Sequence, residues 1–165
     1  MSVKIEFVES SRLWRGALAS RSVARQAIAA AVIESGVALR RSAELSVHLV
    51  DDAAIRAVNA QWRAKDAPTN VLSFPAVEAS GLAEARLLGD ILIAFETVTR
   101  EAADDGKPLA DHYRHLVIHG FLHLLGFDHV EADAAEAMEA VERRALARLG
   151  VADPYSQREL EDAER

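Results

Sequence analysis

Residues 119–129 read HGFLHLLGFDH, and this stretch joins the end of a predicted helix to a cluster of three histidines. His119 and His123 are four residues apart, so their rings project from one face of the helix, one above the other. Gly126 can adopt a positive φ, end the helix and turn the chain back. His129 follows this turn, so we expect three imidazoles to meet at one point.

Three converging imidazoles predict a zinc-type site, with one Zn²⁺ per chain bound by His119, His123 and His129. Three protein ligands leave a fourth position for water, which is typical of catalytic rather than structural zinc. Three unrelated histidines at a helix end are the alternative, but the spacing and the glycine favour a metal site. The sequence does not select among zinc, nickel, copper and iron, because imidazole binds all four.

The same spacing occurs in metzincin peptidases, in which a glutamate general base follows the first histidine. Gly120 occupies that position here and cannot accept a proton. A zinc metallopeptidase therefore stays an alternative that the sequence disfavours.

Outward from this motif, the hydrophobic pattern predicts one domain, residues 1–150, and an acidic tail, residues 151–165, that has little to bury and frays. We expect an α+β domain with a small four-stranded mixed sheet packed against about five helices. Asp51 is expected to cap the second helix. The predicted strands are 3–7, 45–49, 71–74 and 90–95, and the predicted helices are 22–34, 52–62, 97–105, 108–125 and 131–149.

The composition of the 165 residues is that of an ordinary globular protein, 50% hydrophobic and 27% charged. The chain contains no cysteine, which excludes disulfides, thiolate metal sites and cysteine nucleophiles. No apolar run approaches the ~20 residues of a membrane span and the start lacks a signal-peptide pattern, so we expect a cytoplasmic protein without membrane contact. Residues 1–65 carry a net charge of +4 and residues 66–165 one of −11, so a basic surface for nucleic acid would come from the first part.

Three blocks of the chain stand out when they are taken together: NAQWR with KDAPTNVLSFP (59–63 and 65–75), LGDI (88–91) and HGFLHLLGFDH (119–129). These blocks resemble the YbeY family of bacterial single-strand-specific endoribonucleases, and they cover roughly residues 44–150 in the order of the family. Phe127 stands where tyrosine is usual in that family, and Asn70 where aspartate is common, but neither change affects the metal ligands.

The resemblance implies a zinc-dependent endoribonuclease that acts in 3′ maturation of small-subunit (16S) ribosomal RNA and in ribosome quality control. It implies His119, His123 and His129 as the metal ligands, on a helix that lies across the sheet. Arg63 matches the functional arginine of the family. The implied partners are single-stranded RNA and the small ribosomal subunit with its associated proteins.

Phosphodiester hydrolysis at a zinc-bound water suits these residues, because the metal lowers the pKa of that water to near ~7. Arg63 would bind the phosphate as a bidentate guanidinium, and the alternative is an exposed arginine after a helix. His115, one turn before His119, would orient the substrate or carry a proton, or would pack as an ordinary helix residue.

Two aspartates are candidates to accept the other ring N–H of a metal-bound imidazole. Asp90 stands beside a buried strand, and its alternative role is a turn with Gly89. Asp128 stands next to a ligand, and its alternative role is a cap on the following helix.

Thr69 and Ser73 are candidates to line the substrate cleft near Arg63. Phe74 follows them and is expected to pack as an ordinary strand residue. His48 and His112 are expected at the surface. The other open function is a non-enzymatic ribosome-assembly factor whose metal only stabilises the fold. The sequence does not determine the oligomeric state.

Overall fold

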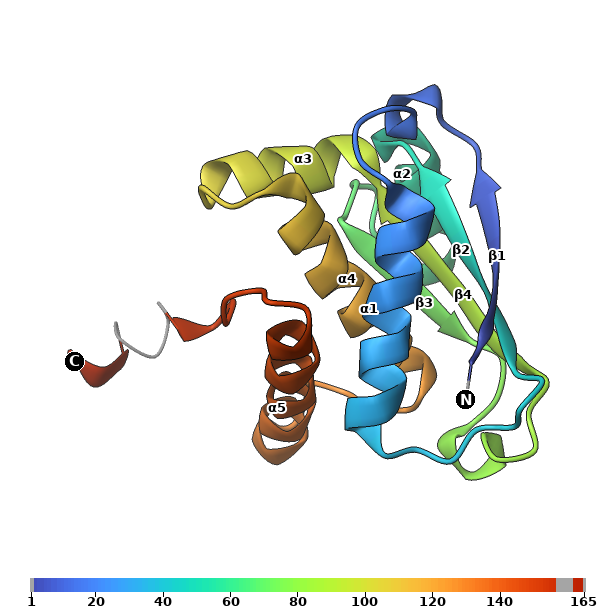
Figure 1. The fold of residues 1–165 in the computed structure, drawn as a ribbon. Coiled ribbons are helices and arrows are strands. Elements are labelled where there is room, and N and C mark those ends of the chain that lie inside the picture. The colour runs from blue at the N-terminus through green and yellow to red at the C-terminus, as the bar shows by residue number, and fades with distance from the viewer. Residues whose placement is uncertain (1, 157–161, 165) are drawn as a thin grey trace.

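Four strands form one mixed sheet in the computed structural model, which describes residues 2–156 and 162–164 (Figure 1). Their order is β1–β2–β4–β3, with β1, β2 and β4 parallel and β3 antiparallel to β4. The predicted α+β domain with a four-stranded mixed sheet and five helices is confirmed. The strands are β1 (Lys4–Glu9), β2 (Glu44–Val50), β3 (Val71–Pro75) and β4 (Leu87–Ala94); the helices are α1 (Ser20–Ser35), α2 (Asp52–Arg63), α3 (Phe95–Asp104), α4 (Leu109–Leu124) and α5 (Ala132–Arg148).

Local signals account for most of the element boundaries. The carboxylate of Asp51 accepts a hydrogen bond from the N–H of Ala54 at 2.8 Å, so the predicted cap of α2 is confirmed. The predicted strand 90–95 starts three residues late and ends one residue late, because β4 runs over Leu87–Ala94 and Phe95 begins α3. The ring of Phe95 packs edge-on against Trp14, with 5.2 Å between centroids, which fixes the chain at this change of direction.

One face of the sheet is covered by helices. Leu45, Val47, Ile91 and Ile93 are buried on this face because side chains alternate along a strand. Helix α4 lies across β3 and β4, as expected for the metal-bearing helix, and α1 and α5 pack beside it (Figure 1). The histidine motif at the end of α4 is therefore held by the sheet beneath it.

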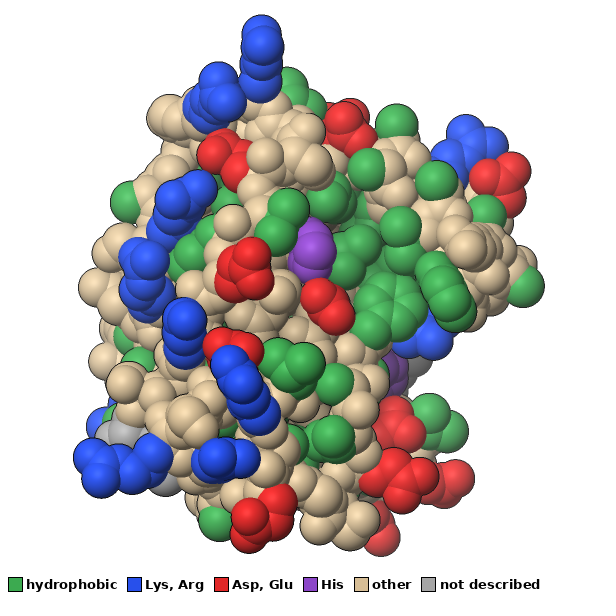
Figure 2. All heavy atoms as spheres, turned by 90° about the vertical axis from the view of Figure 1, so that its right-hand side faces the viewer, with side chains coloured by type: hydrophobic (Ala, Val, Ile, Leu, Met, Phe, Trp, Pro, Cys, Tyr) green, Lys and Arg blue, Asp and Glu red, His purple; other side chains and the backbone are tan. Residues whose placement is uncertain are grey.

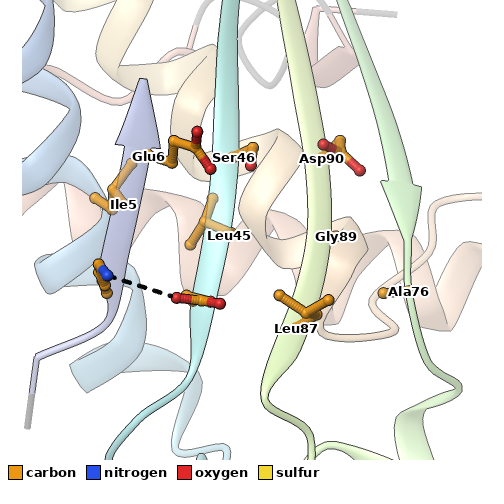
Figure 3. A pocket seen from close by; sticks show the side chains of 10 residues that line it. Ile5, Glu6, Leu45, Ser46, Ala76, Leu87, Gly89 and Asp90 are labelled. Atoms are coloured by element: carbon orange, nitrogen blue, oxygen red, sulfur yellow. Dashed lines mark ion pairs between the residues drawn. The ribbon is translucent and has the colours of Figure 1, made fainter. Parts of the chain in front are cut away.

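The opposite face of the sheet is covered only at one end, by α2, where Ile55 packs with Val50 and Ala94. The remaining part is a polar hollow of about 560 Å³. Figure 3 shows the side chains of Glu6, Ser46 and Asp90 in this hollow, on three neighbouring strands, with the ion pair between Lys4 and Glu44 drawn beside them. This face lies away from α4 and hence from the histidine motif.

Exposed basic side chains gather along one side of the molecule. Figure 2 shows them as a row of Lys and Arg side chains beside an area of acidic and hydrophobic groups. Arg12, Arg15, Arg21 and Arg25, all from the basic first part of the sequence, are exposed. No helix within residues 2–156 or 162–164 is long and apolar enough to cross a membrane.

Residues 151–156 pack back on the domain, which differs from the expected frayed tail. Val151 is partly buried against the core, and the carboxylate of Asp153 accepts a hydrogen bond from Arg143 Nε of α5 at 3.2 Å. The acidic composition of the tail predicts fraying because it gives no weight to the single apolar contact of Val151 with the core or to the side-chain contacts of Tyr155. Residues 157–161 and 165 of the predicted tail lie outside the described residues.

Candidate metal centre and cleft

The three histidines of the motif converge at the end of α4. One ring nitrogen of each lies within 4.8 Å of the corresponding nitrogens of the other two, and His119 Nε2 and His123 Nε2 are 3.1 Å apart. Two nitrogens bound to one tetrahedral zinc would be ~3.3 Å apart. Burial, with the neighbouring His119 and His129, lowers the pKa of His123, which keeps that ring neutral and able to bind a metal.

The partners of the remaining ring nitrogens determine where the protons lie. His119 Nδ1 is 2.7 Å from Glu142 Oε1, and His123 Nδ1 is 3.0 Å from the carbonyl oxygen of Phe127. A carbonyl and an ionised carboxylate can only accept hydrogen bonds, so we infer that both Nδ1 atoms are protonated. The two Nε2 atoms then direct lone pairs at one point with no proton between them. This donor set fits a divalent cation.

The end of α4 is built so that the chain turns back toward its own histidines. Gly126 has a φ of +90°, its N–H donates to the carbonyl of His123, and the N–H of Phe127 donates to the carbonyl of Leu122. These two bonds form the Schellman motif that ends many helices. A Cβ at position 126 would lie 2.8 Å from the Cβ of Ala79, so the turn also needs glycine for space.

Glu142 of α5 belongs to the site although sequence reasoning missed it. Its side chain is 1% exposed, and it accepts hydrogen bonds from His119 and, at 2.9 Å, from His115 Nε2. Burial raises the pKa of Glu142, but the hydrogen bonds from the two histidines outweigh it and lower the pKa to about 2. A signal was present, because Glu142 lies four residues from Met138 and four from Leu146 on the buried face of its helix, where an acidic residue is unusual.

Arg63 lines the same open hollow of about 560 Å³ as the three histidines. It is the last residue of α2, and its guanidinium donates to the carbonyl of Ser73 at 3.1 Å. The same group lies 4.9 Å from the ring centroid of Phe74, so this ring, expected to pack as an ordinary strand residue, instead supports Arg63. The lining of the hollow thus combines three histidine side chains, which could bind a metal ion, with the positively charged side chain of Arg63.

Comparison with known proteins agrees with this arrangement. The profile of a family described as endoribonuclease YbeY matches residues 15–150. This chain belongs to the endoribonuclease YbeY family. Endoribonuclease YbeY of Rhodopseudomonas palustris (strain BisA53) is 50% identical over 157 residues, which cover 92% of this chain and 90% of that protein.

Two further comparisons extend this result. Endoribonuclease YbeY of Methylocella silvestris is 46% identical over 157 residues, which cover 95% of this chain and 88% of the relative. The solution structure of a Thermotoga maritima protein has a similar fold, with a TM-score of 0.55 and 23% identity over 92% of this chain and 97% of that chain.

The packing around Gly120 shows why this chain has no glutamate after His119, the first candidate metal ligand. A Cβ at position 120 would lie 2.9 Å from Ile91 Cγ2 and 3.1 Å from Ser73 Oγ. The position faces the sheet rather than the cleft, and the carbonyl of Gly120 accepts a hydrogen bond from the Ser73 hydroxyl at 2.9 Å. A glutamate there would push α4 away from the sheet, so the general base of a metzincin peptidase has no room.

Both departures from the YbeY pattern have local explanations. Phe127 holds His123 through its carbonyl oxygen, so the change from tyrosine leaves that bond intact. The amide of Asn70 donates to the carboxylate of Glu101 at 3.0 and 3.3 Å. An aspartate at position 70 would place two carboxylates together, so asparagine suits the local charges.

The expectation that Asp90 holds a metal-ligand imidazole is wrong. Asp90 Oδ1 lies 2.9 Å from His48 Nε2 on the open face of the sheet, and the neighbouring Ile91 is the residue that packs against α4. The Nδ1 atoms of His119 and His123 are taken by other partners, as described above. This pair also makes His48 only partly exposed, at 28% of its side chain.

Asp128 lines the hollow beside the histidines. Its carboxylate accepts a hydrogen bond from the backbone N–H of His129 at 2.7 Å and so fixes the chain rather than a ring. The N-cap position of α5 is Glu131, so the alternative role of Asp128 as a helix cap is also wrong.

The other predicted residues are divided between the hollow and the core. Ser73 lines the hollow, whereas Thr69 is half-buried outside its lining. His115, with 14% of its side chain exposed, is directed at Glu142. His112, expected at the surface, is buried because it lies where α4 packs against α3, and its Nε2 is 3.0 Å from a carboxylate oxygen of Glu101.

Proposed function

We propose that this protein is a zinc-dependent endoribonuclease specific for single-stranded RNA, with His119, His123 and His129 as the metal ligands. The observation that carries the proposal is that Arg63 and these three imidazoles line the same hollow. A bound zinc would supply a Lewis acid and a water of lowered pKa beside the scissile phosphate. Membership of the endoribonuclease YbeY family supports RNA as the substrate.

Arg63 would bind the phosphate of the substrate. Its guanidinium is planar and permanently charged, and the contacts with Ser73 and Phe74 already restrict its orientation. A preorganised cation beside a developing negative charge stabilises the transition state without further rearrangement. A hollow of about 560 Å³ has the size of a small-ligand site, which favours an extended single strand over a duplex.

The cellular role that we propose is 3′ maturation of 16S ribosomal RNA and ribosome quality control, in the cytoplasm and together with the small ribosomal subunit. Few aromatic residues are available to stack bases, since they make up 5% of the chain. The choice of cleavage position would therefore depend on strand accessibility and on associated ribosomal proteins.

The test compares zinc content and cleavage of a single-stranded RNA oligonucleotide in identically prepared proteins. We expect about one zinc per chain, loss of metal in His123→Ala, and retained metal with at least ~100-fold slower cleavage in Arg63→Ala. Arg144→Ala is the control, because the Arg144 guanidinium donates to Glu34 of α1 at 3.1 Å and lies outside the lining of the hollow, so cleavage should stay at the parent rate.

Three results would contradict the proposal. Cleavage at full rate by metal-free protein would exclude the metal, and full activity of Arg63→Ala would exclude the role of the arginine. Unimpaired ribosomal RNA processing in cells carrying Arg63→Ala would favour the assembly-factor alternative instead.

A further inference from the structure

The carboxylate of Glu142 collects three hydrogen-bond donors at the back of the histidine cluster. His119 Nδ1 contacts Oε1 at 2.7 Å, and His115 Nε2 contacts Oε2 at 2.9 Å. The hydroxyl of Tyr155 also donates to Oε2. One buried side chain therefore connects a candidate metal ligand to the segment that follows α5.

His115 is placed for this carboxylate rather than for the cleft. Its ring stands perpendicular to that of Tyr155, with 5.5 Å between centroids, and within the described part of the chain its Nδ1 is buried without a hydrogen-bond partner. Burying an unpaired ring nitrogen is unfavourable, so the bond from His115 Nε2 to Glu142 is what compensates for this position of the ring.

Tyr155 is held against Glu142 by its own segment. The N–H of Tyr155 donates to Asp153 Oδ1 at 2.8 Å, and the same carboxylate accepts from Arg143 Nε. The Arg143 guanidinium also lies 5.3 Å from the ring centroid of Tyr155. These contacts dock residues 151–156 on α5 and determine where the tyrosine hydroxyl points.

We propose that Tyr155, together with His115, is a positioning residue for the metal site that acts through Glu142. By donating to Oε2, Tyr155 fixes the carboxylate so that Oε1 receives the Nδ1–H of His119, which leaves His119 Nε2 as the metal-binding atom. The inference rests on the metal site of the proposed function and adds to it a dependence on the C-terminal segment.

Coupling of this kind works in both directions. If a docked Tyr155 strengthens zinc binding, bound zinc must strengthen the docking of residues 151–156 by the same factor. Zinc binding is therefore expected to protect a segment that supplies no metal ligand of its own.

The first test is the zinc affinity of Tyr155→Phe, measured without RNA by competition with a chromogenic chelator. We expect a dissociation constant raised ~3–10-fold, because changes to groups that touch metal ligands cost ~10–100-fold and Tyr155 is one residue further from the ion. The matched control is Tyr113→Phe, which removes another buried hydroxyl, bonded to the carbonyl of Ser20 at 3.0 Å. Tyr113→Phe should lower the melting temperature and leave zinc affinity unchanged.

The second test is amide hydrogen exchange of residues 151–156 in the full chain, with and without zinc. Zinc should slow exchange in the parent and have a smaller effect in Tyr155→Phe. An unchanged zinc affinity of Tyr155→Phe, or equal losses of affinity in both tyrosine variants, would overturn the inference. It would also be overturned if the exchange rates of residues 151–156 were the same with and without zinc. Zinc binding without RNA cleavage would instead contradict only the proposed function.

Discussion

The ligands of the candidate metal site and the residues that support them are encoded in different ways. His119, His123 and His129 come from one continuous motif, and their convergence needs only the helix repeat and one Schellman turn. Glu142 and Arg63 come from α5 and α2, and their positions depend on how these helices pack. The difference teaches that the cluster of candidate metal ligands is formed by local sequence, whereas the groups that orient these ligands and accompany them in the hollow depend on how the whole chain folds.

The largest effect should distinguish a ligand from its support. His123→Ala removes a metal-binding nitrogen and should weaken zinc binding by more than ~100-fold, whereas Glu142→Gln should cost ~10–100-fold because all three imidazoles remain. Chelator competition on both variants measures the difference. Equal losses of zinc affinity in the two variants would mean that the histidines and Glu142 act as one unit, and would contradict the distinction between ligands and the residues that hold them.

A smaller effect should come from the contact between the motif and the sheet. Gly120→Ala places a methyl group 2.9 Å from Ile91 Cγ2, and should lower the free energy of unfolding by about 1–2 kcal/mol after the gain in helix propensity. Urea unfolding of the metal-free parent and variant measures this change in the free energy of unfolding. Gly81→Ala is the control, since its Cβ would meet only Val77 Cβ at 3.8 Å. Equal stabilities of the two variants would show that α4 does not need this close approach.

The smallest effect concerns His112, which lies in the core away from the metal ligands. Burial lowers its pKa below 6.5, against the hydrogen bond and charge of Glu101 and with a contribution from the nearby Lys107 and His115. As the pH falls below 6.5, the unfolded chain takes up a proton before the folded chain does, so the folded state loses stability. His112→Gln should remove this loss.

The measurement for His112 is urea unfolding of parent and variant at about pH 7.5 and about pH 5.5. The stability of the parent relative to the variant should decrease at the lower pH. A difference that stays constant would show that the proton affinity of this ring is the same in both states.

Features of the fold that depend on a few neighbouring residues could be predicted from the sequence, whereas features that depend on the direction of a side chain could not. The sequence predicts the helix cap at Asp51 and the turn at Gly126, because each feature depends only on residues a few positions away. The sequence predicts a contact between Asp90 and a metal-ligand imidazole, which is wrong, because the apolar run after Asp90 shows no alternation from which the face of its side chain could be deduced.

The residues that hold the candidate metal ligands and Arg63 in place could not be predicted from the sequence for a different reason. Glu142 is one of many acidic residues in an Ala- and Glu-rich helix, and only its position on the buried face sets it apart. Tyr155 lies in an acidic tail whose composition suggests fraying, and its contact with Glu142 joins segments that only the packed structure brings together. Arg63 was identified from the family motif, but its support by Phe74 was not.

The main-chain oxygen that orients His123 has a consequence for how this protein tolerates change. Every residue type provides a main-chain carbonyl, so the bond to His123 does not depend on the identity of the side chain at position 127, which packs against the core instead. The number of residues between 123 and 127 does matter, because one added or deleted residue would move the carbonyl oxygen of residue 127 away from the ring of His123. The length of this turn, rather than the side chain at position 127, therefore determines how the ring of His123 is held.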